Sequence, residues 1–529
     1  MSKKPVLSID VIVVGGGPTG LTLANLLAKM GVKVSVIEQN EKTVSEPRAV
    51  SIDDEALRVY QSIGLKDKLR EIIVEGYGSI YRDSSGKEFS RVMPNTREYG
   101  FEKRNAFQQP MLEKILYENF LKFSNSKSFF NWKMLKFLQT NSCVKVTIEC
   151  QKTGKQKIIE GKFLVGCDGA SSLIRKSLNI PLEGTSFKET WVIVDLIKTV
   201  NRNRHTEVFC NPDRPCITLP GPAKTRRYEF MMKANENEDH MLSEQNVRSL
   251  LASVGPDKNE GIKRIRAYAF HARVAKTWRD KRIFLAGDAA HLSPPFAGQG
   301  MNSGVRDAAN LAWKISVSID KNNNEDVLNS YENERKPHAW EMINLALKMG
   351  KIMNPRSHFK AFIVRSFFRT LGLYSPAKDY ISQMKYKPKP SFSSGMIWMD
   401  GKKETVVGKL LPQPNTEDSE KRIKLLDEYF LNTECLLIFD EQPDKFLSRE
   451  LVDKFSVKGC AVIGLTPEWS NSYLSHIQIV RDKSKFFSKS PYCFYIGSAM
   501  LIRKDKYVAA VTSIDKIDKL YDYLCELTA

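Results

Sequence analysis

Residues 11–21 have the sequence Val11-Ile-Val-Val-Gly-Gly-Gly-Pro-Thr-Gly-Leu, an apolar run followed by closely spaced glycines. Four apolar residues in a row predict a buried strand of a parallel sheet. The spacing Gly15-x-Gly17-x-x-Gly20 predicts that a helix follows at once and runs to about Met30. In such a motif the first glycine permits a tight turn, the second lets the backbone approach a pyrophosphate, and the third lets the helix pack on the strand.

A carboxylate follows at the distance that this motif requires. A second apolar run, Val32–Ile37, is expected to form the next strand, and it ends at Glu38. An acid there can bind the hydroxyls of an adenosine ribose, and the start of the helix favours phosphate. These residues do not by themselves distinguish FAD from NAD. The predicted dinucleotide-binding residues are Gly15, Gly17, Pro18, Thr19, Gly20, Glu38 and Gln39.

Two further predicted strands end in acidic residues. Phe163-Leu-Val-Gly-Cys leads through Asp168-Gly169 into a helix, and Arg282-Ile-Phe-Leu-Ala leads through Gly287-Asp288 into a loop with two prolines and further glycines. A long helix is expected to begin at about Asn302. These three motifs, in this order, resemble those of the aromatic-ring hydroxylases among the group A flavoprotein monooxygenases.

This resemblance implies an α/β fold, with FAD and NAD(P)H as cofactors. The fold would be an FAD-binding Rossmann-like domain of the glutathione-reductase type with an inserted β-rich substrate domain. Asp288 can bond the ribityl hydroxyls, and backbone N–H groups at the helix start would stabilise the reduced flavin anion. The family's second motif contacts both cofactors. The matching residues are Asp168, Gly169 and Arg175 in the second motif, and Gly287, Asp288, Pro295, Gly298, Gly300, Met301 and Asn302 in the third.

Other segments resemble the 3-(3-hydroxyphenyl)propionate hydroxylases. They are Glu46-Pro-Arg-Ala-Val-Ser-Ile-Asp-Asp-Glu-Ala-Leu-Arg, Phe101-Glu-Lys-Arg-Asn-Ala-Phe-Gln-Gln-Pro, Trp191-Val-Ile-Val-Asp-Leu and Arg226-Arg-Tyr-Glu-Phe-Met. The resemblance implies that Arg48 lies against the flavin and that Gln109 contacts the ribityl chain. The loop Ser293-Pro-Pro-Phe-Ala-Gly-Gln-Gly-Met is more similar to the phenol hydroxylases, which leaves the substrate open.

The pattern of elements predicts four parts. Residues 1–180 would form the first part of the FAD-binding domain, 181–280 the β-rich substrate domain, and 281–385 the second part with a helical region. A Pro/Ser-rich linker from Lys387 would lead to an α/β domain over 395–529, which resembles the thioredoxin-like tail of some phenol hydroxylases. Its strands are expected at Cys435–Phe439, Cys460–Gly464 and His476–Val480.

The expected reaction is hydroxylation of a phenolic ring with NAD(P)H and O2 through a flavin hydroperoxide. A base near the phenol would activate the ring, and the candidates are Asp53, Asp54 and His271. In the predicted strand at 226–232, alternate residues share a face. We place Arg226, Tyr228 and Phe230 on the pocket face, with Arg226 holding a substrate carboxylate, as in a 3-(3-hydroxyphenyl)propionate-like substrate.

Other classes of protein remain open. A flavin halogenase is disfavoured because its W-x-W-x-I-P motif is missing, whereas an FAD-dependent epoxidase, a polyketide-type hydroxylase or a non-catalytic flavin-binding regulator are alternatives. The basic amphipathic stretch from His358 is expected to pack on the core, and a membrane-surface contact is its alternative. The charge of +20 is scattered, so we expect no nucleic-acid partner. We also expect no metal site, no membrane span and a cytoplasmic location with reduced thiols, and we leave a homodimer open.

Overall fold

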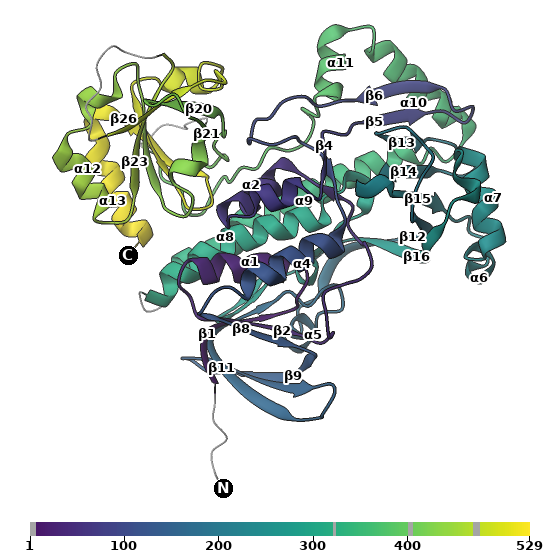
Figure 1. The fold of residues 1–529 in the computed structure, drawn as a ribbon, viewed down its shortest axis with the longest axis horizontal. Helices are drawn as coiled ribbons and strands as arrows, with labels where there is room; N and C mark the ends of the chain where they lie inside the picture. The colour runs from purple at the N-terminus through teal and green to yellow at the C-terminus, as the bar shows by residue number, and fades with distance from the viewer. Residues whose placement is uncertain (1–6, 321–323, 400–405, 469–476, 529) are drawn as a thin grey trace.

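A computed structural model describes residues 7–320, 324–399, 406–468 and 477–528 (Figure 1). The first glycine-rich motif lies in a mixed sheet whose strands follow the order β17-β18-β11-β1-β2-β8. The strands of this path are β1 (Leu7–Val14), β2 (Val34–Glu38), β8 (Ser126–Phe130), β11 (Gln156–Gly166), β17 (Arg279–Asp280) and β18 (Ile283–Leu285). Strands β9 (Trp132–Gln139) and β10 (Val144–Cys150) extend it from β11 as an antiparallel ribbon.

Helices cover this sheet on the side that carries the three motifs. In Figure 1, α1 (Pro18–Lys29), α4 (Gln109–Phe120) and α8 (Gly300–Asp320) lie together on one face. Helix α1 packs so closely on the strand that a Cβ on Gly20 would lie 2.0 Å from the carbonyl oxygen of Gly15. The predicted strand-turn-helix arrangement is therefore present, and α8 begins at Gly300, two residues before the expected position.

A second sheet lies beside the first and has the order β19-β16-β12-β15-β14-β13-β5-β6. Its strands are β5 (Ser79–Arg82), β6 (Glu88–Val92), β12 (Leu182–Leu196), β13 (Thr206–Phe209), β14 (Cys216–Pro220), β15 (Arg226–Met231), β16 (Ile262–Ala275) and β19 (His291–Leu292). Strands β5 and β6 come from residues expected in the FAD-binding domain. The proposed substrate domain over 181–280 is thus completed by an earlier hairpin, which pairs with it through β13.

Short elements connect these layers. Strands β3 (Ser51–Ile52), β4 (Val74–Glu75) and β7 (Asn105–Ala106) form a small sheet. The remaining helices of this region are α2 (Asp54–Ser62), α3 (Lys66–Arg70), α5 (Leu173–Ser177), α6 (Glu238–Met241), α7 (Glu244–Val254) and α9 (Glu325–Met353).

The basic amphipathic stretch forms α10 (His358–Leu371), followed by α11 (Ser375–Ser382). As expected, α10 packs on an apolar cluster that includes Phe89 of β6, through Val364 and Phe368, although none of its residues is fully buried. Phe359 is 72% exposed and Phe367 is 57% exposed, because α10 lies against the edge strand β6 with only part of its surface. Among the described residues, no helix is both long and apolar enough to cross a membrane.

The C-terminal part forms its own sheet with the order β21-β20-β24-β23-β22-β25-β26. Its elements are β20 (Asn415–Asp418), β21 (Ile423–Leu425), β22 (Cys435–Phe439), α12 (Arg449–Ser456), β23 (Ala461–Thr466), β24 (Gln478–Asp482), β25 (Ser498–Ile502), β26 (Val508–Ser513) and α13 (Ile517–Thr528). The three expected strands correspond to β22, β23 and β24, although His476 lies outside the described residues. The thioredoxin-like assignment stays a prediction.

The C-terminal part packs on α8 and α9 through both apolar and charged contacts. Trp313, Val317 and Val327 share an apolar cluster with residues of its sheet. Beside them, the fully buried carboxylate of Glu334 accepts two 2.8 Å hydrogen bonds from Arg503 and one of 2.7 Å from Lys314. Although burial raises the pKa of Glu334, these two cations hold it well below its ordinary value.

Replacing this carboxylate is expected to destabilise the protein. Glu334→Gln would leave Lys314 buried without a counter-charge among the described residues and Arg503 with only Asp505, at 2.5 Å, which costs about 3–5 kcal/mol. Because the pKa of Glu334 is lowered by folding, its contribution is present at neutral pH and is lost only as pH falls through that lowered value. Thermal unfolding measures the effect. The control is Glu118→Gln, whose 3.8 Å pair with Lys114 is exposed and is worth about 0–1 kcal/mol. An equal decrease of Tm in both variants would contradict the assignment.

Candidate functional site

A cavity of about 670 Å³ extends from the glycine-rich turn to the face of the second sheet. Its wall includes residues of both sheets, of α9 and of the segment that begins at Lys387. Fifteen of the predicted cofactor residues line it: Gly15, Gly17, Pro18, Thr19, Glu38, Gln39, Arg48, Gln109, Asp168, Gly169, Asp288, Pro295, Gly298, Gly300 and Met301. The three motifs, which are far apart in the sequence, therefore meet at one cavity.

The end of the cavity near β1 has the features of a dinucleotide site. A Cβ on Gly17 would meet no atom within 4 Å, so the backbone at the start of α1 is open to a ligand. Glu38 follows β2, and its carboxylate accepts hydrogen bonds from the backbone N–H groups of Gly16, at 2.7 Å, and Asn40, at 2.8 Å. The open helix start suits a pyrophosphate, and the fixed carboxylate suits ribose hydroxyls.

The other two motifs place carboxylates on the same cavity. Asp168 accepts from the Ser172 hydroxyl at 2.6 Å and from the backbone of Ile174 at 3.2 Å. Asp288 projects into the cavity and has no hydrogen-bond partner among the described residues, and the surrounding protein raises its pKa through desolvation. An acceptor of this kind matches the polyol chain of FAD. The residues present therefore fit FAD, which Asp288 would hold at the ribityl hydroxyls and Gly300 and Met301 would hold at the flavin ring.

Two expectations about flanking residues are compatible with this arrangement. Arg48 lies on the cavity, and its charge lowers the pKa of Asp288 in opposition to desolvation. Gln109 begins α4, where its side-chain oxygen accepts from the Ala49 backbone at 2.7 Å and its amide donates to Glu113 at 2.7 Å. Both residues thus border the space expected for the flavin.

Four predicted cofactor residues do not line the cavity: Gly20, Arg175, Gly287 and Asn302. They have supporting positions. Arg175 donates to the backbone oxygens of Ala289, at 3.2 Å, and Ala170, at 3.0 Å, and so ties the second motif to the third. The Asn302 side chain donates to the backbone oxygen of Gly298 at 2.8 Å and accepts from the Asp53 backbone at 3.2 Å. The side chains of Arg175 and Asn302 thus hold the loops that carry the lining residues.

The far end of the cavity is floored by the second sheet. Val208 pairs with Tyr81 on β5 and with Ile217 on β14, and Ile217 pairs with Glu229 on β15. These four residues form a row across four strands, and all of them line the cavity. The opposite wall is mainly apolar, which suits an aromatic ring. Its side chains include Phe296, Leu345, Met349, Met353 and Met384.

Glu229 is the carboxylate in this floor. Its side chain is buried against the cavity, and among the described residues it makes no hydrogen bond; Arg227, at 3.8 Å, is the cation within 4.0 Å of its carboxylate. The pKa of Glu229 is raised to about 7, chiefly by burial; the nearby charge of Arg227 opposes this shift and that of Asp195 favours it. A carboxylate with this pKa that faces a ring-sized space can exchange a proton with a bound ligand at neutral pH. The sequence-based search did not identify it.

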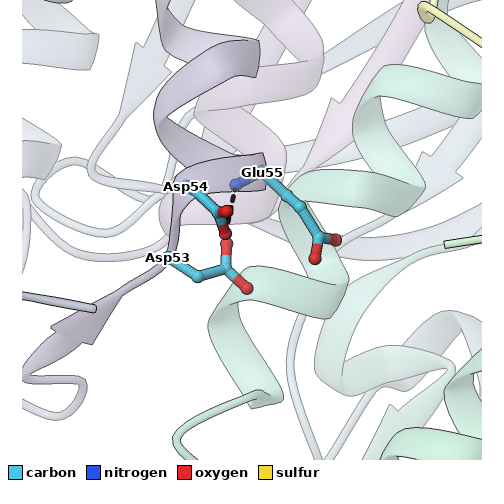
Figure 2. A group of neighbouring side chains, drawn as sticks. All are labelled: Asp53, Asp54 and Glu55. Carbon is cyan, nitrogen blue, oxygen red and sulfur yellow. Dashed lines mark hydrogen bonds between the residues drawn. The ribbon is translucent and has the colours of Figure 1, made fainter. Parts of the chain in front are cut away.

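The predicted bases Asp53 and Asp54 lie beside the cavity but do not line it. Figure 2 shows them with Glu55 at the start of α2. Asp53 caps the helix by accepting from the Ala56 backbone at 2.9 Å, and it pairs with Arg306 at 2.5 Å and Lys387 at 3.0 Å. Its assignment as a base is therefore wrong, since its oxygens are already bonded within the protein.

The neighbouring carboxyls also belong to this network. Although burial raises the pKa of Glu55, Arg306 and Lys387 lower it to about 2. Asp54 is buried and has no cation within 4.0 Å among the described residues, and burial raises its pKa to about 7. Because it does not reach the cavity, this shifted pKa gives it no contact with a ligand there, and its role as a base is not supported.

The strand that carries Arg226 alternates as predicted, but the faces are reversed. Arg227 and Glu229 line the cavity, whereas Tyr228 and Phe230 pack in the apolar cluster with α7. Arg226 is buried on the far side, where it donates to Thr218 at 3.0 Å, and the Tyr228 hydroxyl donates to Asp257 at 2.7 Å. Neither residue can contact a ligand in the cavity, so both assignments are corrected.

His271 is also placed elsewhere. It lies on β16, outside the cavity lining, and its Nδ1 is 2.8 Å from the hydroxyl of Ser186. Its assignment as a base is wrong because β16 lies beyond β12 and two strands from β15 in the sheet. The cavity is reached instead by residues of β5, β13, β14 and β15.

Comparison with protein families gives two matches. Residues 8–346 match a family described as the FAD binding domain, and residues 408–527 match the HcaD C-terminal domain. The first match covers every residue of the three motifs. The second coincides with the separate C-terminal sheet.

Relatives and solved structures agree with these matches. The chain is 32% identical over 525 residues to the 3-(3-hydroxy-phenyl)propionate/3-hydroxycinnamic acid hydroxylase of Escherichia coli strain K12, covering 98% of this chain and 95% of the relative. The protein of E. coli O81 strain ED1a has the same identity and coverage. Among solved structures, the flavin-dependent monooxygenase PieE, in complex with FAD and substrate, has a TM-score of 0.83 at 19% identity over 99% of this chain and 100% of that chain. The OxyS anhydrotetracycline hydroxylase of Streptomyces rimosus has a TM-score of 0.75 at 21% identity over 98% of each chain.

The cofactor assignment predicts a yellow protein whose FAD is released by acid. Asp288→Ala is expected to weaken FAD retention strongly, because the change removes an acceptor that faces the cavity without another partner. Cys167→Ser is the matched control, since it keeps the size of a side chain next to Asp168. Absorbance of the purified variants and fluorescence of the FAD released from them measure retention. Equal retention in both variants would contradict the role of Asp288.

Proposed function

Because this chain belongs to the FAD-dependent aromatic hydroxylases, we propose that it hydroxylates a phenolic ring bound on the floor of the cavity, with a 3-(3-hydroxyphenyl)propionate-like compound as substrate. The relatives that share 32% identity are named for that substrate and for 3-hydroxycinnamic acid. The observation that carries the proposal is Glu229, a buried carboxylate without a hydrogen bond among the described residues, in a ring-sized space next to the FAD-binding residues.

Bound FAD supplies the redox chemistry, which consists of oxidation of NAD(P)H and activation of O2 for insertion into the ring. The residues of this chain orient the ring and set its charge. The apolar wall formed by Phe296 and the methionines excludes water and packs on the ring. Glu229 accepts the phenol proton through its carboxylate oxygen. Loss of that proton makes the ring more electron-rich, and an electron-rich ring is the better substrate for oxygen insertion.

The other classes considered from the sequence receive less support. The relatives at 32% identity are named as hydroxylases, whereas the structural neighbours at 19% and 21% identity share the fold alone and add no support for the epoxidase, the polyketide-type hydroxylase or the flavin-binding regulator. A homodimer and a cytoplasmic location stay predictions.

Glu229→Gln is expected to decrease kcat/KM for 3-(3-hydroxyphenyl)propionate by about 10²- to 10⁴-fold. The carboxyl acts as a base only when ionised, so activity of the parent enzyme should rise as pH increases through about 7, the pKa of Glu229. The variant should lack this rise. Rates of hydroxylated product formation between pH 5.5 and 9, roughly the range around that pKa, provide the measurement.

Asp54→Asn is the matched control. Asp54 has the same raised pKa of about 7 but lies outside the cavity lining, so its variant should keep the pH dependence. If the rise with pH disappears in Asp54→Asn and persists in Glu229→Gln, the assignment of the base is wrong. If the parent enzyme forms no hydroxylated phenol at all, the proposed function itself fails.

A further inference from the structure

We propose that Arg104 forms an anion subsite that holds the carboxylate of the substrate side chain, at the opposite end of the cavity floor from Glu229. The inference rests on the proposed function and adds the direction in which the substrate lies. Arg104 precedes β7 and lines the cavity beside β5.

The guanidinium of Arg104 is fixed in place by neutral groups. It donates to the Ser79 hydroxyl and, at 3.3 Å, to the Tyr77 hydroxyl, and it stacks on the Tyr77 ring with its central carbon 4.5 Å from the ring centroid. A guanidinium has five N–H donors, and these two bonds leave three of them without a partner among the described residues. Arg104 is thus oriented without being neutralised.

Two other cations that line the cavity, Arg227 and Lys387, are already paired. Arg227 donates to Asp195 at 2.7 Å, and Lys387 contacts Asp53 at 3.0 Å and Glu55 at 2.7 Å. In contrast, Arg104 has no carboxylate within 4.0 Å among the residues that the structure describes. A partly buried cation is stabilised by an anion, so the favoured position for an anionic group of the ligand is beside Arg104.

The site is completed by hydroxyl groups. Tyr81 and Tyr386 line the cavity, and the phenol groups of both lie close enough to Arg104 to interact with it electrostatically. The hydroxyl of Tyr386 has no hydrogen-bond partner among the described residues, although its side chain is largely enclosed. A carboxylate bound to Arg104 could accept hydrogen bonds from the guanidinium fork and from a tyrosine together.

The distance between the two polar ends fits a short side chain. Glu229 lies on β15, and Ser79, the partner of Arg104, lies on β5, three strands further along the sheet. With neighbouring strands about 4.8 Å apart, the two backbones are separated by about 14 Å. Glu229 lines the cavity from β15, and the guanidinium of Arg104 reaches Ser79 from the segment before β7. The remaining space accommodates one ring and a short chain, with the phenol at Glu229 and the carboxylate at Arg104.

The test compares 3-(3-hydroxyphenyl)propionate with its primary amide, which has the same shape and no charge. FAD-loaded protein is titrated with each compound in the absence of NAD(P)H, and Kd is obtained from the change in flavin absorbance. Arg104→Met should raise Kd for the acid by roughly 10- to 150-fold and leave Kd for the amide nearly unchanged. The KM values in turnover should follow the same pattern, with kcat little affected.

Two further variants keep the test decisive. Arg104→Lys keeps the charge but loses the planar fork, so its Kd for the acid should lie between those of the parent and Arg104→Met. It also serves if Arg104→Met does not fold. Arg226→Met, on the same sheet but facing away from the cavity, should not change the ratio between acid and amide.

The outcomes separate the subsite from the proposed function. A selective loss of acid binding in the Arg104 variants supports the subsite. Equal effects on acid and amide, no effect on either, or a change of the ratio in Arg226→Met alone would overturn it. Failure of the parent enzyme to hydroxylate either compound would count against the proposed function, and it would be seen independently because binding is measured without turnover.

Discussion

The site depends on the close approach of three strand ends and two helix starts. Thr19, at the start of α1, lies between the turn after β18 and the first turns of α8. A Cβ on Gly287 in that turn would be 2.5 Å from the Thr19 hydroxyl oxygen, and a Cβ on Gly304 in α8 would be 2.2 Å from it. A Cβ on Gly15 would lie 2.1 Å from the carbonyl oxygen of Cys167. Only glycine allows this spacing. As a result, Asp168 and Asp288 face the same cavity as the start of α1, although the three motifs are far apart in the sequence.

A buried charge network closes the other side of the cavity. Arg306 on α8 and Lys387 beyond α11 both contact the acids at the start of α2. Isolated charges at these positions would be expensive to bury, and mutual pairing compensates for the cost. The segment expected to be a free linker is therefore held as part of the cavity wall, since Lys387 lines it. A second network around Glu334 attaches the C-terminal sheet to α8 and α9. Both networks use α8, so the helix that opens at the flavin site also connects it to the C-terminal part.

The sequence predicted well what depends on local chemistry. Glycine spacing and an acid after each strand located most of the cofactor residues, because these features are required within a few residues of one another. It was less informative where a choice depends on distant packing. Alternation in Arg226–Met231 separated its two faces correctly, yet which face meets the cavity is decided by α7, which covers Tyr228 and Phe230. Both faces carry an arginine, so composition alone could not choose between them. Asp53 and Asp54 are acids that could act as bases, but the sequence did not reveal their surroundings. Asp53 is bonded to Arg306 and to the helix backbone, and Asp54 lies outside the cavity lining.

A charged side chain in this cavity can bind a ligand strongly only if another residue of the protein does not already pair with it. The chain has an excess of positive charge, and several cations line the cavity, but Arg227 and Lys387 contribute little to an incoming anion because Asp195, Asp53 and Glu55 already neutralise them. The same reasoning applies to acids: the carboxylate of Asp53 is already bonded to Arg306 and Lys387, whereas Glu229 keeps a pKa near neutrality because burial is only weakly offset by Arg227, 3.8 Å away. On the floor of the cavity, among the residues that the structure describes, the incompletely paired groups are Glu229 and Arg104. They lie at opposite ends of an apolar floor, and a molecule with a proton to give at one end and a negative charge at the other is the ligand that satisfies both.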